Sequence, residues 1–480
     1  MIREFERNRL PFTELCRGEF GRKQIFTSAK EINKDNIVKV LGDSLATHWS
    51  NRAEIRYLDR YYRGDQPILY TVKKVRPEIN NKIVENHALE IVRFMNAQKF
   101  GEPIQYINRT KDEKITKMVD SLNDLMSSLD KYAHDIELGE WQSICGTAYR
   151  FIWIDTSKEY SFDIETLSPL DTFVVYSTGN GKKPLMSVQL VKSEEGKNQY
   201  QCYTEKEYFL IEGSKIISEE TNGMFRIPIV EFTNNSRRLS DIEIVSTMLD
   251  AINKVQSNRL NGIEQFVQAF MKFVNCEIDK DSFLEMCELG AIAIKGNQGV
   301  QADVNLISQQ LDQEQTQVSK DDLYKNVLII EGMPSREQNT GGDTGQAVYL
   351  RNGWDFAEQR AELIEPAIIR SEKRFLDIVF YILKTKGKDI KLNIKDVDVK
   401  ITRNKTDNML VKSQALLNYL AAGINPKIAI SSCEAFGDPE KVFVQSKPYL
   451  DTKYKTVDMT KSEELNKSIS TLNGGDNNVT

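Results

Sequence analysis

Histidine, tryptophan and cysteine are scarce in this chain of 480 residues, which contains three, four and six of them. The histidines, His48, His87 and His134, lie far apart and show no metal-ligand spacing. The chain has no Gly-x-x-x-x-Gly-Lys-Ser/Thr segment, which argues against a P-loop motor. The sequence therefore predicts no catalytic residue, no metal site and no cofactor.

The cysteines form no Cys-x-x-Cys pair, and no secretory leader is evident; they are Cys16, Cys145, Cys202, Cys276, Cys287 and Cys433. We expect buried free thiols in a protein made in a reducing cytoplasm. Long apolar runs are also missing, since even residues 378–383 are far too short to span a bilayer. The sequence therefore predicts no membrane contact.

Excess positive charge is absent too. The chain has 64 basic and 70 acidic residues, for a formal net charge of −6. A protein that makes many phosphate contacts gains strong, salt-sensitive affinity from counterion release. The composition therefore argues against a sequence-specific DNA-binding protein, while the length is sufficient for several domains with a substantial core.

A long amphipathic stretch begins near Ser240. Ser240 and Glu243 have the spacing of a capping box, and apolar residues recur at helical intervals up to Val274. This pattern predicts a helix over 240–274. Its other face carries uncharged polar side chains: Asn253, Ser257, Asn258, Asn261, Gln265 and Gln268. Both an ordinary surface helix and a wet, weakly charged wall fit this pattern.

A compact insert and a second helix follow. The sequence of the insert predicts a short helix that ends at Gly290. Two strands, 291–294 and 304–307, should follow around the turn at 295–299. Apolar periodicity then returns and predicts a helix over about 310–332, although Ser319 and Asp322 could equally mark its start.

A polar, glycine-rich loop comes next: Gln338, Asn339, Thr340, Gly341, Gly342, Asp343, Thr344, Gly345 and Gln346. It has some likeness to a phosphate-binding loop before a helix, but it lacks the lysine and no strand clearly leads into it. Its glycines allow cheap changes of backbone shape. A loop that makes polar contacts with a passing partner and an ordinary surface loop both remain open.

The rest of the chain predicts an α+β fold. Residues 1–50 have a weak pattern that is typical of a flexible arm, and strands dominate from Ala148 to Phe232. A long helix should follow Ala347, with a kink near Pro366 because proline removes one helical hydrogen bond. The polar tail from Lys455 to Thr480 predicts little order.

The order of several segments resembles the portal proteins of long-tailed, siphovirus-type bacteriophages. The similar segments follow one another over residues 55–450: 61–64, 81–84, 145–149, 152–155, 228–235, 240–243, 249–253 with Ser257, 341–347 and 401–404. Their order and spacing together are fairly specific, whereas each segment alone is not.

This resemblance implies a portal-type fold with a wing, a two-helix stem, a small α/β clip, a tunnel loop with a long kinked helix, and a helical C-terminal crown. The implied boundaries are 1–239 for the arm and wing, 240–274 for stem helix 1, 275–308 for the clip, 309–332 for stem helix 2, 333–346 for the tunnel loop, 347–404 for the wing helix and strand, and 405–480 for the crown and tail.

The resemblance also implies a function. A homo-oligomeric ring, typically a dodecamer, would assemble in the host cytoplasm and occupy one capsid vertex of the virion. Double-stranded DNA would pass through the ring during packaging and ejection. Terminase, a major capsid or scaffolding protein, and a head–tail adaptor would be its partners. Residues 338–346 would form the tunnel loop of the DNA channel, and the uncharged polar side chains of the first helix would form the polar face of the stem.

Two other classes of protein stay open on the sequence alone. One is a metal-dependent DNA-processing enzyme built around scattered acids, although the pairs Glu219–Glu220 and Asp321–Asp322 are more typical of solvated faces. The other is a different head–tail connector or a capsid component.

Overall fold

The computed structural model describes residues 20–74, 77–110, 112–267, 270–274, 281, 303–307, 313–335, 353–387, 390–403, 409–433, 435–436 and 439–453. Helices and strands are mixed along the chain, which confirms the α+β class. The chain divides into two compact units, residues 1–403 and 404–480.

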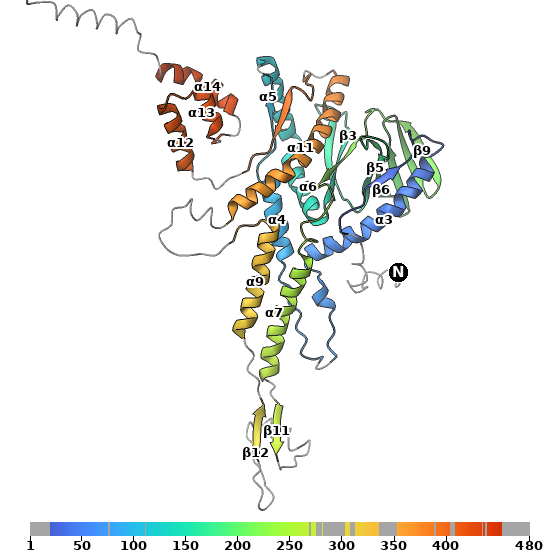
Figure 1. Cartoon of the computed structure of the whole chain (residues 1–480). Coiled ribbons are helices and arrows are strands. Elements are labelled where there is room, and N and C mark those ends of the chain that lie inside the picture. Colours follow the sequence, from blue (N-terminus) through green and yellow to red (C-terminus); the bar gives the residue numbers. More distant parts are fainter. Residues whose placement is uncertain are drawn as a thin grey trace, which may run out of the picture. The chain divides into compact units, whose positions relative to one another are not determined.

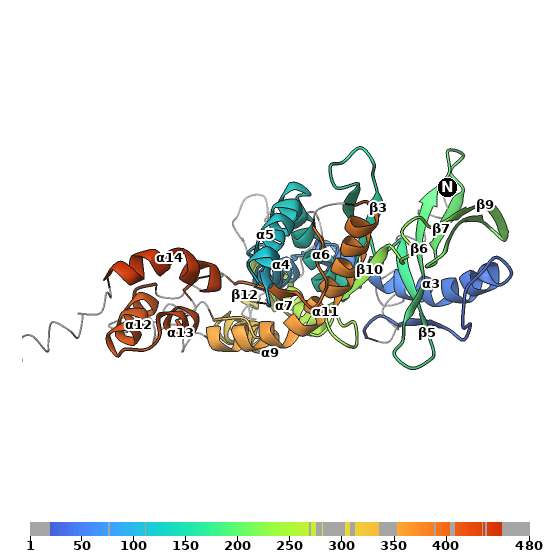
Figure 2. The same ribbon diagram turned by 90° about the horizontal axis from the view of Figure 1, so that it is seen from above.

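A six-stranded sheet with the order β1-β5-β6-β7-β8-β9 forms one part of the first unit. Its strands are β1 Ile25–Thr27, β5 Thr172–Ser177, β6 Pro184–Lys192, β7 Asn198–Tyr203, β8 Glu207–Glu212 and β9 Lys215–Thr221. Strands β5 to β9 form an antiparallel meander, and β1 joins its edge in parallel with β5. Helix α3, Ile37–Tyr62, lies along this sheet (Figure 2) and buries Ile37 and Leu41 against it.

The arm predicted over residues 1–50 is therefore wrong from residue 20 onward, because this part of the chain supplies β1 and the start of α3. Residues 1–19 lie outside the described part. A tertiary contact holds the beginning of the described chain: the Arg22 guanidinium lies 3.0 Å from the Glu243 carboxylate and 3.2 Å from that of Glu54. Residues 20–50 are ordered because they pair with segments far away in the sequence, and a local sequence pattern does not reveal such pairing.

The largest hydrophobic core lies around a second, three-stranded antiparallel sheet with the order β10-β3-β4. Its strands are β10 Ile229–Thr233, β3 Thr147–Ile154 and β4 Phe162–Leu167. Residues from four helices pack into this core: α4 His87–Phe100, α5 Glu113–Ser128, α6 Lys131–Cys145 and α11 Trp354–Thr385. The short strands β2 Gln105–Asn108 and β13 Val397–Lys400 pair beside them. The strands predicted between Ala148 and Phe232 are confirmed.

A buried polar cluster crosses this core. Asp135 on α6 lies 2.7 Å from Lys131 and 2.8 Å from Arg150 on β3, and Lys131 lies 3.0 Å from Glu372 on α11. Tyr106 on β2 donates a hydrogen bond to Glu372. Two cations face two anions, so each buried charge has a partner, and loss of any one of them would leave an uncompensated charge.

Helices α7, Ser246–Val267, and α9, Gln313–Glu331, lie side by side, and the antiparallel strands β11, Phe270–Val274, and β12, Asp303–Ile307, follow at their far end (Figure 1). The second helix is confirmed. The first is shorter than the predicted 240–274: residues 241–245 form turns, and the chain is already a strand at 270. Within the insert, 304–307 is a strand as predicted, but it pairs with β11; residues 291–299 lie outside the described part.

The structure explains why α7 begins later than the predicted residue 240. Ser240 and Glu243 do form a capping-box contact, since the Ser240 N–H donates to Glu243 Oε2 at 2.9 Å. Ser240 is, however, held by the body of the fold, because its hydroxyl donates to the Ser143 carbonyl at 3.1 Å. The box therefore fixes a buried turn, and the regular helix begins at Ser246.

The long helix after the glycine-rich loop is α11, which contains Pro366. It starts at Trp354, after Gly353 in a left-handed conformation with φ of 83°, so the described helix begins later than the predicted Ala347. Figure 1 shows that the helix changes direction along its length, as predicted from the proline. Residues 338–346 of the loop lie outside the described part.

The described residues of the second unit form three helices, in the region where the sequence predicts a helical C-terminus: α12 Met409–Ala421, α13 Pro426–Ser432 and α14 Pro439–Lys453. Few of its described side chains are buried, namely Ala429, Ile430 and Cys433. Large apolar side chains are exposed on all three helices, including Leu417, Ile428 and Val444. The tail 455–480 lies outside the described part.

The cysteines that the structure describes are buried and free: Cys145, Cys202 and Cys433. Burial raises the pKa of the Cys145 thiol to about 12, which keeps it protonated at neutral pH. The prediction of buried thiols is confirmed for these three. Among the described helices, none combines the length and the apolar character needed to span a bilayer.

Candidate functional site

The helix pair α7 and α9 joins the body of the fold through polar contacts at its base. The Lys320 ammonium on α9 lies 2.5 Å from the Glu85 carboxylate, and the Tyr324 hydroxyl donates to Glu90 on α4 at 2.9 Å. Between the two helices, Arg259 donates to Gln317 at 2.6 Å. The contacts of Lys320 and Tyr324, together with the buried Leu249 and Val327, attach the pair to α4 and to the segment before it.

An extended segment before α4 runs antiparallel to α7 and forms hydrogen bonds with its polar face. The backbone N–H groups of Asn81, Ile83 and Glu85 donate to Asn261, Ser257 and Asn253 at 2.7, 3.0 and 2.8 Å. The two periods match, because four helical residues rise about 6 Å and two extended residues about 6.6 Å. Every fourth side chain of the helix thus meets every second amide of the strand-like segment.

This ladder corrects the interpretation of the polar face. Asn253, Ser257 and Asn261 are buried within the subunit, so they do not form a solvent-facing wall. Asn258 is exposed as expected. The side chain of Gln265 and all of Gln268 lie outside the described part. The amides and hydroxyls of this face accept from three backbone donors of a half-buried segment, which explains why polar side chains occupy it.

Asn253→Ala tests the ladder. The substitution removes the acceptor of the Glu85 N–H and the donor to Gln66, and should lower the free energy of unfolding by about 1–3 kcal/mol. The matched control is Asn258→Ala on the same helix, where an exposed position should change stability by less than about 0.5 kcal/mol. Chemical denaturation of both variants measures the difference; equal midpoints would contradict the assigned role of Asn253.

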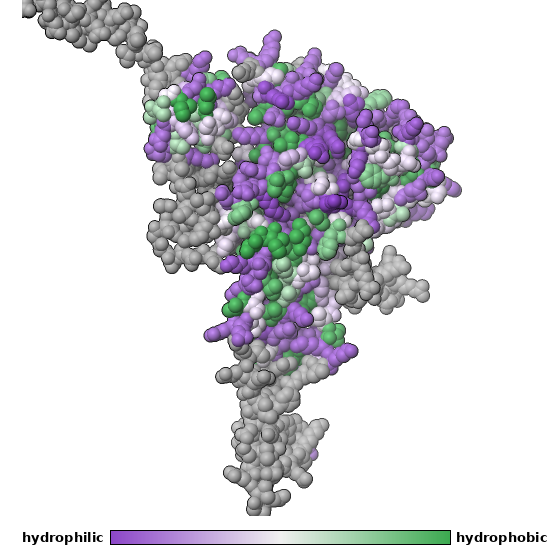
Figure 3. Space-filling view, viewed as in Figure 1, coloured by the Kyte–Doolittle hydropathy of each residue, from purple (hydrophilic) through white to green (hydrophobic). Residues whose placement is uncertain are grey.

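Apolar side chains are exposed where α9 ends and α11 begins. Ile329 and Ile330 are 65% and 45% exposed, and Phe356 in the first turn of α11 is 69% exposed. Figure 3 shows hydrophobic residues gathered near this end of α9. Leu363, two turns after Phe356 on the same helix, is 83% exposed. We call these four residues the apolar face; exposed apolar groups of this kind are typical of protein contact sites.

A buried charge cluster lies beneath this face. The Arg360 Nη2 atom on α11 lies 2.9 Å from Glu331, the last residue of α9, and 3.1 Å from Asp241. Asp241 lies 3.5 Å from Lys99 on α4, whose ammonium also donates to Ser143 and Asn234. We call Lys99, Asp241, Glu331 and Arg360 the ionic joint, because they come from four separate segments.

The two carboxyl groups of the ionic joint have pKa values that are shifted in opposite directions. Burial, together with the charge of Asp241, raises the pKa of Glu331 to about 8. Although burial alone would raise it, the pKa of Asp241 is lowered because the positive charges of Lys99 and Arg360 outweigh burial. Burial lowers the pKa of Lys99. Asp241 is therefore the anion that the two cations stabilise, and Glu331 is the carboxyl group whose ionisation is disfavoured.

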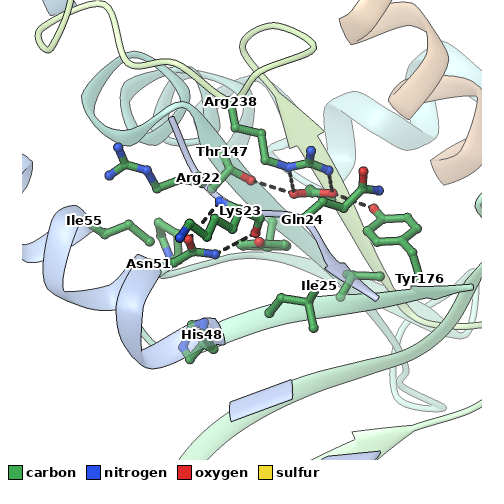
Figure 4. A pocket seen from close by; sticks show the side chains of 14 residues that line it. Arg22, Lys23, Gln24, Ile25, His48, Asn51, Ile55, Thr147, Tyr176 and Arg238 are labelled. Atoms are coloured by element: carbon green, nitrogen blue, oxygen red, sulfur yellow. Dashed lines mark hydrogen bonds and ion pairs between the residues drawn. The ribbon is translucent and has the colours of Figure 1, made fainter. Parts of the chain in front are cut away.

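A second buried group, around Glu231, borders a small cavity (Figure 4). Arg238 donates to both carboxylate oxygens of Glu231 at 2.8 Å, and Tyr176 and Thr147 donate to the same carboxylate. The cavity measures about 10 Å³, which is room for one water-sized sphere, whereas small-molecule sites span several hundred Å³. These contacts tie β10 to β3 and β5 and leave no space for a substrate.

The histidines have structural surroundings. His48 stacks on Phe173 with ring centroids 4.5 Å apart, and burial lowers its pKa to about 4. His87 contacts Glu90 and the ring of Tyr324 at the base of the helix pair. Among the described residues, no three potential ligands converge on a metal position. The acidic pairs Glu219–Glu220 and Asp321–Asp322 lie on exposed parts of β9 and α9, as predicted.

The family described as "Phage portal protein, SPP1 Gp6-like" matches residues 41–454 of this chain. The chain belongs to the phage portal protein family. The resemblance drawn from the order of its segments is confirmed, and the match covers both helices of the pair, the ionic joint and the helices of the second unit. Because portal proteins are structural components of the capsid, the alternative of a DNA-processing enzyme is set aside.

One curated relative is the portal protein of Bacillus phage SPP1, which is 25% identical over 225 residues. The aligned part is 46% of this chain and 43% of that protein, so the chain spans less than half the length of this relative.

Solved structures with a similar chain include two necks of gene transfer agent particles. A chain of the native neck, computed with C12 symmetry, has 10% identity and a TM-score of 0.45, and the alignment covers 80% of this chain and 94% of that one. A chain of the empty-particle neck, computed with C6 symmetry, has 9% identity and a TM-score of 0.43, with coverage of 78% and 90%.

Proposed function

We propose that this chain is the subunit of a homo-oligomeric portal ring at one capsid vertex of a phage, through which double-stranded DNA passes during packaging and ejection. The observation that carries the proposal is the family match over residues 41–454. The ring, typically of twelve subunits, assembles in the host cytoplasm and becomes part of the virion. Terminase, a major capsid or scaffolding protein, and a head–tail adaptor are its partners.

The parts of the fold receive roles within this proposal. The pair α7 and α9 is the stem, and β11 with β12 forms the base of the clip that meets the adaptor. Residues 333–346 are the tunnel loop, α11 is the wing helix, and α12 to α14 form the crown. The side-by-side helices that lead to a pair of antiparallel strands support these assignments, because the chain leaves and re-enters the body at one place (Figure 1).

Charge supports a conduit rather than a DNA-gripping protein. The formal net charge of −6 provides no general excess of cations for phosphate contacts. A head-to-tail interface that closes presents the same patch of every subunit to a central hole. One weak polar contact per subunit from Gln338, Asn339, Thr340 or Thr344 would therefore add up around the ring without holding the DNA fast.

Electron microscopy of the purified full-length chain tests the proposal. We expect annular particles with a central hole, and native mass measurement should give one closed subunit number for most particles. Immunolabelling of virions should place the chain at a single vertex. A chain that stayed monomeric at all concentrations and was missing from virions would contradict the portal assignment.

A further inference from the structure

The end of α9 is built around Arg360. Gly332, with φ of 62°, ends the helix: its N–H donates to the Ile329 carbonyl and the Met333 N–H to the Leu328 carbonyl. A Cβ atom at Gly332 would come within 3.1 Å of the Arg360 side chain, so Arg360 lies directly across the helix terminus. A cation at this position interacts favourably with the last carbonyl groups of the helix.

The same guanidinium also holds two carboxylates. Its Nη2 atom lies close to both Glu331 and Asp241, and both acids are fully buried. The second oxygen of Glu331, Oε1, accepts no hydrogen bond from the described residues. Two buried carboxylates that share one nitrogen repel each other, so the less well-solvated one resists ionisation. Glu331 has the fewer donors and is therefore the one affected.

We propose that Glu331 and Arg360 are a positioning pair that fixes the end of α9 against α11 and α4, and that ionisation of Glu331 loosens this attachment. The charged groups that face Glu331 come from every element packed around it: Lys99 from α4, Asp241 from the turn before α7, and Arg360 from α11. The pair links the stem helix to the wing helix, so the meaning of this joint for a DNA channel rests on the proposed function.

The direction of the pH effect follows from linkage. Burial, with Asp241 beside it, raises the pKa of Glu331 to about 8 from its ordinary value of 4.5. An opened joint, where Glu331 is solvated, therefore binds fewer protons than the closed joint between these two pH values. Through Glu331, opening becomes more favourable as the pH rises to about 8, by at most tenfold per pH unit, whereas the lowered pKa of Lys99 acts in the opposite direction.

Hydrogen–deuterium exchange of the full-length protein measures this opening. Peptides covering residues 323–335 are followed from pH 5.5 to 9, with rates corrected for the intrinsic chemistry of exchange. We expect the opening constant of the wild type to rise several-fold per unit up to pH 8. Glu331→Gln keeps an acceptor for Arg360 but has no charge, so its profile should be flat. Arg360→Met should raise exchange at every pH.

The matched control is Arg403→Met. Arg403 also binds two carboxylates of α11, Glu358 and Glu365, at 2.8 and 2.7 Å, but neither acid belongs to α9. Exchange of residues 323–335 should not change in this variant. The proposal would be overturned if the opening constant of the wild type did not change with pH, or if it changed equally in Glu331→Gln. If the variants do not fold, the pH dependence of the wild type alone decides. Microscopy of the same samples separates the outcomes: a sloping profile without rings contradicts the portal assignment only.

Discussion

Gly146→Ala should strongly destabilise this protein. Gly146 ends α6 with φ of 81°, its N–H donates to Gln142 at 2.8 Å, and its carbonyl accepts from Asn234 at 3.0 Å. A Cβ atom would overlap the backbone carbonyl of Arg238 and lie 2.9 Å from Leu239. Backbone strain of about 1–2 kcal/mol and the displacement of a backbone segment act together. We expect a loss of more than about 4 kcal/mol, a large share of the stability of a typical domain.

Gly181→Ala is the control that separates strain from overlap. Gly181 has φ of 84°, almost the same as Gly146, but no atom lies within 4 Å of a Cβ built there. This variant should stay folded and lose only about 1–2 kcal/mol. Soluble yield and denaturant unfolding of both variants give the comparison. Similar stabilities for the two would show that the close packing of Gly146 on Arg238 is unimportant.

Phe356→Asp combined with Leu363→Asp should abolish ring formation and leave the subunit folded. Both side chains are largely exposed on one face of α11, 69% and 83%, and a large apolar group in the centre of an interface can contribute more than 2 kcal/mol. Two carboxylates at that place, repeated in every subunit, would each require burial without a partner. Sedimentation velocity should show monomers where the wild type forms closed oligomers.

The control for this prediction is Ile217→Asp on the edge strand β9. Ile217 is 54% exposed and belongs to the six-stranded sheet, not to α11, so its replacement should leave ring formation unchanged. Unfolding midpoints of all variants should stay close to the wild type, because surface substitutions alter stability little. Rings of normal size in the double variant would exclude the apolar face as the subunit contact.

Helical period made most of the larger elements predictable. The apolar positions Leu323 and Val327 predict α9, and Pro366 predicts the bend in α11. For α7, the same reasoning predicted that the polar face is exposed, but most of its described residues are buried. The apolar Ile263 is 51% exposed, whereas Asn253 and Asn261 are buried. The spacing of four residues between Asn253, Ser257 and Asn261 was the available signal, since such a row can serve an extended segment.

Other features have no local signal. Strand β1 has only three residues and exists because Ile25 pairs with Val175 in a parallel register. In α3, buried polar residues such as Ser44, His48 and Asn51 interrupt the apolar period, which conceals a 26-residue helix. The ionic joint joins residues from positions 99, 241, 331 and 360, and only a folded chain brings them together.

The pairing of β2 with β13 sets a condition on biosynthesis. Tyr106 lies opposite Val399, so a strand made early in translation waits for one that emerges almost three hundred residues later. At about 5–20 residues per second, a ribosome needs roughly 15–60 seconds to make the residues between the two strands. Until then, the main core has an open side and nascent chains expose apolar surface. Assembly partners can thus recognise a finished subunit only after nearly all of its first unit has left the ribosome.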